Sequence, residues 1–129
     1  MRELLLVAVG GAVGAMGRYG VGLWARARFG PDFPWGTFTV NVTGSLVLGF
    51  LMGLSLSGRL DRNLRTVLAT GFCGAFTTFS TFSFETLGLL REGYVMRAVA
   101  NLGASLALGL AAAMLGLWLG QLGAPPVTD

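Results

Sequence analysis

The chain contains no histidine and no lysine, and its one cysteine, Cys73, lies in an apolar stretch. Without histidine, and with six carboxylates scattered singly, there is almost nothing from which to build a zinc site or a nucleophilic triad. A single cysteine forms no disulfide within the chain and gives no information on the redox compartment. The nine arginines are dispersed instead of forming a stripe interleaved with exposed aromatics, which argues against nucleic-acid binding. The sequence therefore predicts a protein that is not an enzyme and has no nucleic-acid partner.

Charge is also scarce, because charged residues make up 12% of the 129 residues while apolar residues make up 53%. The mean hydropathy is +0.70, and a soluble domain of this size would expose a more charged surface. The sequence therefore predicts an all-α integral membrane protein. At about 1.5 Å per residue, four apolar segments are long enough to cross the hydrocarbon core. We expect a single transmembrane domain over residues 1–129, with spans at residues 4–24, 36–57, 66–90 and 95–120 and a polar tail over residues 123–129.

The stretch from Gly71 to Ser83 departs from what an ordinary membrane helix requires. Gly71 and Gly74 are followed by five hydroxyl-bearing residues within seven positions, and phenylalanines recur at every third position of the same stretch. Glycine, serine and threonine weaken a regular helix, and irregular backbone survives at membrane depth only when it is buried in protein or lines a wet cavity. We therefore expect the third span to be broken near its middle, beside an ion or solute path. Helix packing through small residues, with hydroxyls bonded back to their own backbone, is the alternative interpretation.

Polar residues of two other spans line up on helix faces. Thr37, Asn41 and Ser45 recur at intervals of four, and Asn101 and Ser105 share a face of the last span. An amide in mid-membrane needs a partner, so we expect the Asn41 stripe to face protein or a pore and not lipid. Interhelical hydrogen bonding alone would also account for Asn41.

Arg18 and Glu85 are charged residues inside the expected spans, each toward one end. For Arg18, a side chain that snorkels to the interface and a side chain that faces a water-filled vestibule are both open interpretations. Glu85 lies where a carboxylate reaches interfacial water, so we interpret it as vestibular and not as a proton carrier in mid-membrane.

Glycine pairs spaced by four recur along the chain, and this spacing lets two helix backbones approach closely. The pairs expected to allow such an approach are Gly10 and Gly14, and Gly49 and Gly53, while Gly116 and Gly120 are expected to end the last span.

The arginines are divided evenly between the two sides that four spans define. Four lie on the side of the N-terminus and the second loop, and four lie on the side of the first and third loops, or five with Arg18. The positive-inside rule acts through an excess of Lys and Arg in cytoplasmic loops, and here no clear excess exists. The chain is therefore able to insert both ways, which would make an antiparallel dimer available.

Three motifs extend along the chain: Gly10–Ala15 followed by Arg18 and Tyr19, then Gly36–Gly44, and then Gly71–Phe82. Together they resemble the Fluc/CrcB fluoride channels. They occur in order and at the right spacing over nearly the whole chain, and the third is highly specific. The resemblance implies a fluoride-selective channel in the cell membrane, the inner membrane of a prokaryote, that lets fluoride leave the cell and so lowers its toxicity. It also implies a multi-pass, dual-topology antiparallel homodimer in lipid, with two pores and a structural sodium ion, Na+, at the dimer centre.

The resemblance also assigns roles to individual residues. The sodium-coordinating carbonyls would belong to Gly74 and Thr77. The ion pathway would be lined by the pore phenylalanines, the pore asparagine, a hydroxyl track and a vestibular arginine, with the polar residues of the last span added: Phe79, Phe82, Asn41, Ser80, Thr81, Arg18, Asn101 and Ser105.

Two other functions are compatible with a short four-span protein. A small proton-coupled multidrug exporter also forms an antiparallel dimer, but it needs a titratable acid deep in the membrane, and Glu85 is the sole candidate. A non-transporting membrane assembly subunit is the other alternative, and it would show no ion flux in liposomes.

Overall fold

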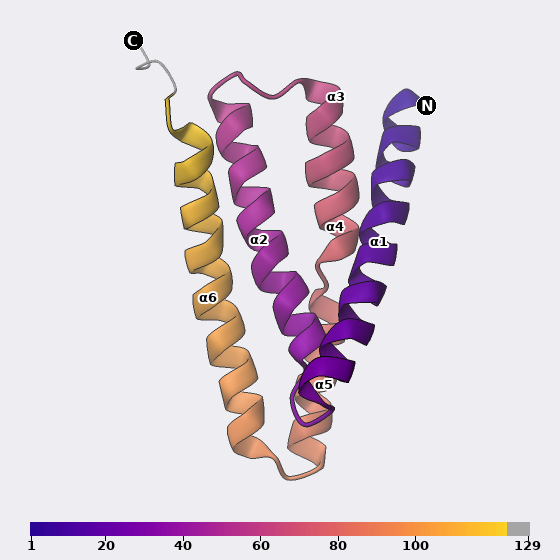
Figure 1. Ribbon diagram of the computed structural model, residues 1–129, viewed down its shortest axis with the longest axis vertical. Helices are drawn as coiled ribbons and strands as arrows, with labels where there is room; N and C mark the ends of the chain where they lie inside the picture. Colours follow the sequence, from indigo (N-terminus) through magenta and orange to yellow (C-terminus); the bar gives the residue numbers. More distant parts are fainter. Residues whose placement is uncertain (124–129) are drawn as a thin grey trace.

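The computed structural model describes residues 1–123, and all of its elements are helical (Figure 1). The elements in chain order are α1 (Arg2–Phe29), α2 (Trp35–Leu56), α3 (Arg62–Arg65), η1 (Thr66–Cys73), α4 (Gly74–Phe76), α5 (Phe79–Arg91) and α6 (Val95–Gln121). Four helical stretches are long and apolar enough to cross a membrane: α1, α2, the composite stretch Arg62–Arg91 and α6. This confirms the prediction of an all-helical chain with four long apolar spans. Most of the expected polar tail, residues 124–129, lies outside the described residues.

The helices end at glycines that adopt positive φ angles. Gly30 (φ 79°), Gly58 (φ 68°) and Gly93 (φ 84°) turn the chain after α1, α2 and α5, in a region that side chains disfavour. α1 continues to Phe29, beyond the expected limit at residue 24. Arg26 and Arg28 occupy its last turn, where positive charge interacts favourably with the helix dipole.

The two ends of the helix bundle hold different connections. Figure 1 shows the N-terminus and the α2–α3 connection at one end, and the α1–α2 and α5–α6 connections at the other. The first end holds Arg2, Arg59, Arg62 and Arg65, and the second holds Arg26, Arg28, Arg91 and Arg97. The even division of arginines that the sequence indicated is thus present in the folded chain.

The glycine pairs are the points where helix backbones meet. A Cβ atom at Gly10 or Gly14 of α1 would overlap a backbone carbonyl oxygen of η1, that of Val67 or Phe72. In the same way, Gly49 and Gly53 of α2 lie against the backbone of α6, while Gly116 and Gly120 of α6 lie against the backbone of α2. This confirms close approach at the two predicted pairs, and it adds Gly116 and Gly120 as a third pair that the sequence analysis did not predict. Such contacts stabilise membrane helices through van der Waals packing, since lipid supplies no hydrophobic drive between them.

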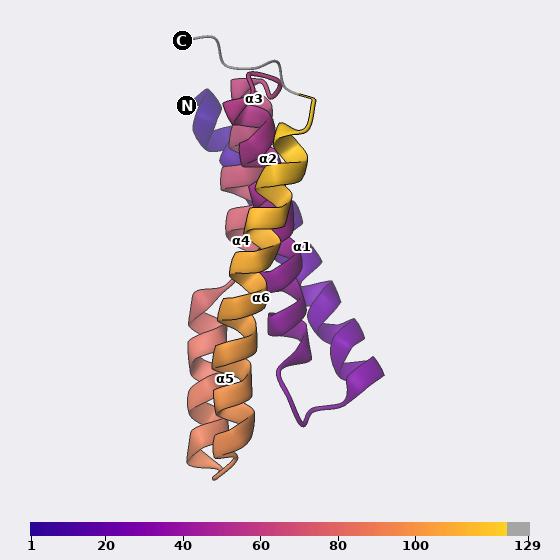
Figure 2. The same cartoon turned by 90° about the vertical axis from the view of Figure 1, so that its left-hand side faces the viewer.

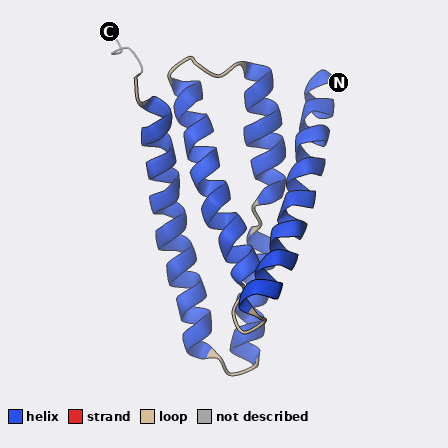
Figure 3. Ribbon diagram, in the orientation of Figure 1, coloured by secondary structure: helices blue, strands red, loops and turns tan. Residues whose placement is uncertain are grey.

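The third span changes its backbone geometry twice. It begins as the short helix α3, capped by the side chain of Asp61, and widens into the π-helix η1 over eight residues. π-helical turns are rare in proteins, and those that do occur are often found at functional sites. After α4, Thr77 (ψ 158°) and Thr78 (φ −152°) are extended, and α5 begins at Phe79. The break stands out as a loop within the helix in Figure 3, which confirms the predicted interruption of this span.

α5 packs mainly against α6 and contacts the elements that precede it less extensively. Figure 2 shows α5 beside the lower half of α6, while the lower ends of α1 and α2 diverge to the opposite side. The α1–α2 connection is tied to α6 by Arg97, whose guanidinium donates to the carbonyl oxygen of Asp32 at 3.1 Å. The break therefore marks the point where the third span leaves α1 and joins α6.

Candidate ion path

The break is held in place by the side chain of Asn41, which comes from α2. Asn41 Nδ2 donates to the carbonyl oxygen of Thr78 at 3.0 Å, and the backbone N–H of Thr78 donates to Asn41 Oδ1 at 2.8 Å. One amide thus pairs with both polar groups of an extended residue, as a neighbouring β-strand would. Because an unpaired buried backbone group is costly, these two bonds explain how the chain leaves the helix inside the membrane.

The hydroxyl of Thr78 starts the second half of the span. It accepts a hydrogen bond from the backbone N–H of Thr81 at 3.2 Å, which is the contact of a helix N-cap. It also lies 3.1 Å from the hydroxyl of Thr81 and 3.2 Å from that of Ser80. The predicted hydroxyl track, Ser80 and Thr81, is therefore one connected group with the buried Thr78 at its centre.

The same two contacts release two carbonyls from the helix. In a continuous α-helix the N–H of Thr78 would donate to Gly74 O, and that of Thr81 to Thr77 O. Here these N–H groups donate to the side chains of Asn41 and Thr78 instead. Gly74 is exposed on the surface of the protomer, and among the described residues no atom lies within 4 Å of where its Cβ would be. The carbonyls that the family resemblance assigned to sodium, those of Gly74 and Thr77, are among the carbonyls that the break deprives of helical partners.

The two predicted pore phenylalanines differ in their surroundings. Phe79 is 79% exposed, while Phe82, one helical turn later, is 7% exposed. Their ring centroids are 5.9 Å apart, with the ring planes tilted by 43°. Phe82 is therefore packed within the protomer, and Phe79 is available to a neighbour outside it.

A cavity of about 480 Å³ reaches the break from the side of α1. Arg18 and the track residue Thr81 line it together with Thr78 and Glu85. This places Arg18, which is half-buried, beside a cavity. Two further lining residues, Arg26 and Thr37, were not assigned to the site from the sequence. The sequence did contain a signal for both residues. Arg26 lies eight residues after Arg18 on the same helix face, and Thr37 is the first residue of the stripe that contains Asn41.

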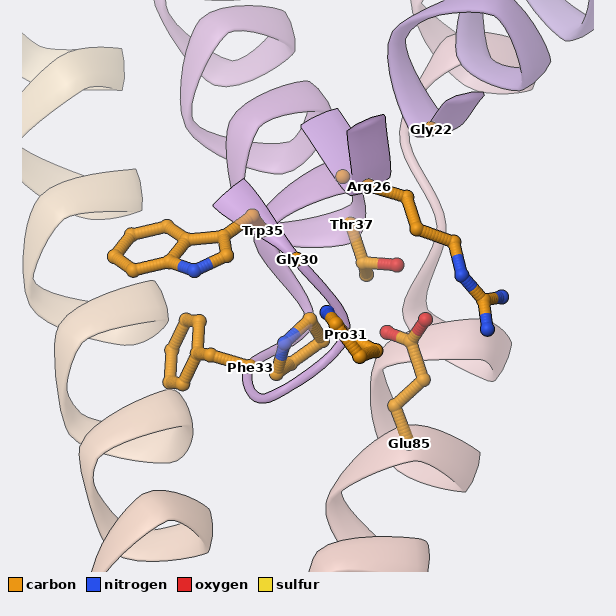
Figure 4. Close-up of a pocket in the computed structure, with 10 residues that line it drawn as sticks. Gly22, Arg26, Gly30, Pro31, Phe33, Trp35, Thr37 and Glu85 are labelled. Atoms are coloured by element: carbon orange, nitrogen blue, oxygen red, sulfur yellow. The ribbon is translucent and has the colours of Figure 1, made fainter. Parts of the chain in front are cut away.

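A second cavity, of about 240 Å³, lies next to the first and is shown in Figure 4. Arg26 extends toward the carboxylate of Glu85 in this view, and Thr37 lies above the same carboxylate. In the part of the chain that the structure describes, Oε2 of Glu85 is buried and has no hydrogen-bond partner. Buried polar atoms are normally satisfied by protein or by ordered water. The cavity thus presents a carboxylate oxygen and a guanidinium to whatever small polar species enters it.

Asn101 and Ser105, the predicted path residues of the last span, lie away from these cavities. Asn101 is 0% exposed and donates through Nδ2 to the hydroxyl of Thr86 on α5, at 2.9 Å. The hydroxyl of Ser105 donates to Asn101 Oδ1 at 3.3 Å. Asn101 and Ser105 therefore form a link between α5 and α6, and their place on an ion path stays a prediction.

Comparison with known proteins identifies the family. The family model described as "CrcB-like protein, Camphor Resistance (CrcB)" matches residues 5–117. The chain belongs to this family. This confirms the resemblance drawn from the three sequence motifs, all of which lie within the matched range.

Individual relatives of the CrcB chain are similar over almost their full length. The chain is 49% identical to a fluoride-specific ion channel FluC of Thermus thermophilus, over 93% of this chain and 94% of the relative. It is 50% identical to the fluoride-specific ion channel FluC 1 of Streptomyces avermitilis, over 91% and 94%. It is 47% identical to the fluoride-specific ion channel FluC of Acidobacterium capsulatum, over 92% and 96%.

Proposed function

We propose that this CrcB-family protein is a fluoride-selective ion channel that lets fluoride leave the cell and so lowers its toxicity. The observation that carries the proposal is the set of relatives, 47% to 50% identical over nine-tenths of the chain, that are named fluoride-specific ion channels. These relatives are bacterial, and four helices able to span a membrane make the chain a multi-pass membrane protein. We therefore assign it to the inner membrane of a prokaryote.

The residues around the break suit a small, strongly hydrated anion. A fluoride pore has to replace water with hydrogen-bond donors, yet a fixed positive charge deep in the pore would hold the ion too tightly. The Ser80–Thr81 hydroxyls and the Asn41 amide are neutral donors. Phenylalanine edges bear the positive end of the ring quadrupole, so Phe79 and Phe82 can line an anion path without a charge.

The arginines are placed where they would attract an anion without trapping it. Arg18 and Arg26 line the wide cavity on the side of α1, and Phe79 and Phe82 are not among the residues that line it. The two guanidinium groups outnumber the one carboxylate in the lining, that of Glu85. A cleft with an excess of positive charge raises the local concentration of anions and speeds their entry. We assign this cavity as the vestibule, with Asn41, Phe79, Phe82 and the hydroxyl track as the path beyond it.

The working unit in this proposal is an antiparallel dual-topology homodimer with two pores. The even division of arginines between the two ends supports insertion in both orientations. The surface at the break supports a partner there, since Phe79 and Gly74 are exposed on it. A two-fold axis in the membrane plane would bring the two breaks together.

A sodium ion at the centre of that dimer fits the chemistry of the break. Gly74 and Thr77 carbonyls would hold it, because both have lost their helical hydrogen-bond donors. Carbonyl oxygens are hard ligands that suit a small hard cation, and irregular backbone in membrane proteins coordinates sodium in this way. When bound, the ion would neutralise the carbonyl dipoles of two facing breaks.

The channel function is tested with purified protein in liposomes loaded with fluoride. We expect rapid release of fluoride and much slower release of chloride from matched liposomes. Protein-free liposomes give the background for both ions. A protein that released neither ion would be a non-transporting subunit, and the proposal would be wrong.

Orientation is tested by shifting the arginine balance. Two or three Arg residues added beside Arg59 should drive that end to the cytoplasm and give a population of one orientation. This variant alone should lose fluoride flux, and co-expression with a variant that has added Arg residues near Arg28 should restore it. If the unmodified protein is labelled at Glu3 from only one side of the membrane and still conducts fluoride, the antiparallel dimer is excluded.

A further inference from the structure

We infer that Thr86 and Asn101 are positioning residues of the ion path, which hold Phe82 in place without touching the ion. The inference rests on the proposed function, because it takes Phe82 as part of the fluoride path. Thr86 lies one turn after Phe82 on α5, and Asn101 faces it from α6.

Four polar groups form one directed chain that ends on Phe82. The Ser105 hydroxyl donates to Asn101 Oδ1 at 3.3 Å, and Asn101 Nδ2 donates to Thr86 Oγ1 at 2.9 Å. The Thr86 hydroxyl then donates to the carbonyl oxygen of Phe82 at 2.7 Å. Each hydroxyl or amide that accepts a bond also donates the next, and such chains strengthen their members cooperatively.

Burial keeps the two central members of the chain away from a permeating ion. Asn101 is 0% exposed and Thr86 is 6% exposed within a single protomer. A path that runs along the surface between two protomers would therefore not reach the Asn101 amide. The Asn101 amide and the Thr86 hydroxyl bond to each other, so removal of either one leaves one hydrogen-bonding group of the other without its partner.

The position of α5 explains why this series of hydrogen bonds can control the orientation of the helix. α5 packs mainly against α6, and among the described residues the bond from Asn101 to Thr86 is the one side-chain hydrogen bond between these helices. The break separates α5 from α4, so the backbone of the first half transmits little rotation to the second. The link to α6 therefore sets the rotation of α5 about its axis, and with it the direction of the Phe82 ring.

The test compares Thr86→Val, which keeps the side-chain shape but removes the hydroxyl, with Thr86→Ser, which keeps the hydroxyl. Asn101→Leu and the Thr86→Val/Asn101→Leu double variant complete the set. The matched control is Thr66→Val, because the exposed Thr66 hydroxyl makes the same type of bond, to Arg62 O at 3.0 Å, without an interhelical partner. Fluoride efflux and the fluoride-to-chloride ratio are measured per assembled channel, after size exclusion.

We expect Thr86→Val and Asn101→Leu each to slow fluoride efflux per channel by about tenfold and to lower the fluoride-to-chloride ratio, since each removes the hydrogen bond between α5 and α6. Thr86→Ser should stay near the unmodified rate. The double variant should be no slower than either single one, because both break the same chain. A role in stability alone would reduce the yield of assembled protein but not the efflux or selectivity of each channel.

Two results would overturn the inference, and Phe82→Leu separates them. If Phe82→Leu slows efflux while Thr86→Val conducts like Thr66→Val, the positioning role is wrong and the proposed path stands. If Phe82→Leu leaves efflux unaltered, the assigned path and the positioning role are both wrong. Should Thr86→Val fail to assemble, Asn101→Leu against Thr86→Ser makes the same comparison.

Discussion

The two halves of the third span are held by different kinds of contact. Before the break, η1 meets α1 through backbone, with Gly10 and Gly14 against its carbonyl oxygens, and its inner face is buried at Ala69 and Cys73. After the break, α5 is held by hydrogen bonds, from the Thr78 cap at its start to the Asn101–Thr86 link. One half is fixed by backbone packing, and the other by a few polar side chains.

This difference indicates that the first half of the third span is a structural support and that the second half carries residues of the proposed ion path. Backbone contacts between helices adjust little, because a change of one methyl group has to move a whole helix. Hydrogen bonds of neutral side chains leave nearby donors free to exchange partners with an ion. Four residues assigned to the fluoride path, Phe79, Ser80, Thr81 and Phe82, are on the second half. The two assigned to sodium lie at the end of the first half, Gly74, and in the break itself, Thr77.

The largest effect is expected from a methyl group between α1 and the first half. A Cβ at Gly14 would overlap the carbonyl oxygen of Phe72, so Gly14→Ala should separate the two helices. Overpacking of this kind typically costs about 1–3 kcal/mol, and more where only backbone can yield. We expect a clear loss of thermal stability in detergent and a lower yield of assembled protein.

The matched control for Gly14→Ala is in the same helix. No described atom lies within 4 Å of a Cβ at Gly20, so Gly20→Ala should stabilise α1 slightly through its helix propensity. Equal thermal stability of the Gly14→Ala and Gly20→Ala variants would show that backbone packing between α1 and η1 does not fix the first half of the third span.

A large loss of flux, together with a loss of stability, is expected from changes to the Asn41 side chain, whose two bonds to Thr78 form a clamp between α2 and the break. Asn41→Asp keeps an acceptor for the Thr78 N–H but has no donor for Thr78 O when ionised, and its charge would repel fluoride in a low-dielectric site. Asn41→Leu removes both bonds without adding charge. Each lost bond leaves a buried backbone group unsatisfied, at about 1–3 kcal/mol.

Fluoride efflux and thermal stability of the two Asn41 variants distinguish the causes. If conduction needs the two bonds from Asn41 to Thr78, both variants should show almost no fluoride efflux. If charge alone matters, only Asn41→Asp should lose efflux. Efflux at the original rate in both would remove Asn41 from the ion path.

The break itself was predictable from the sequence, but its mechanism was not. Glycines followed by hydroxyls over Gly71–Ser83 weaken a helix wherever they occur, so local composition was sufficient. The extended residues are Thr77 and Thr78 because an amide 37 positions before Thr78 pairs with it. Such long-range pairing leaves no periodic pattern in the sequence.

Other features depended on packing that no local pattern records. The residues of η1, Thr66–Cys73, carry no pattern that distinguishes a π-helix from an α-helix. The structure shows the π-helical form of this segment, which packs against the glycines of α1. Asn101 and Ser105 were identified as a shared polar face, and this was correct for their mutual bond. Whether that face meets an ion or another helix depends on the placement of α5, which the sequence does not define.

The two phenylalanines should respond differently to the same replacement. Phe82→Leu alters a ring that is 7% exposed and should lower both fluoride efflux and stability, the latter by about 1 kcal/mol. Phe79→Leu alters a ring that is 79% exposed in the protomer and should lower efflux with a smaller change in the stability of the protomer fold. Efflux from liposomes and thermal unfolding in detergent measure the two effects. Unaltered efflux in both variants would show that neither ring lines the path.

The smallest effect is expected from a methyl group added to the second half. Gly88 lies inside α5, and no described atom is within 4 Å of where its Cβ would be. An alanine there should stabilise the helix by up to about 1 kcal/mol, because glycine loses more backbone entropy in a helix. The same change at Gly71 in the first half should destabilise, since its Cβ would lie 3.0 Å from the carbonyl oxygen of Val7 on α1. If the two halves differ as described, the unfolding temperature should therefore rise for Gly88→Ala and fall for Gly71→Ala. A destabilising Gly88→Ala would instead reveal a neighbour from the second protomer packed on that face of α5.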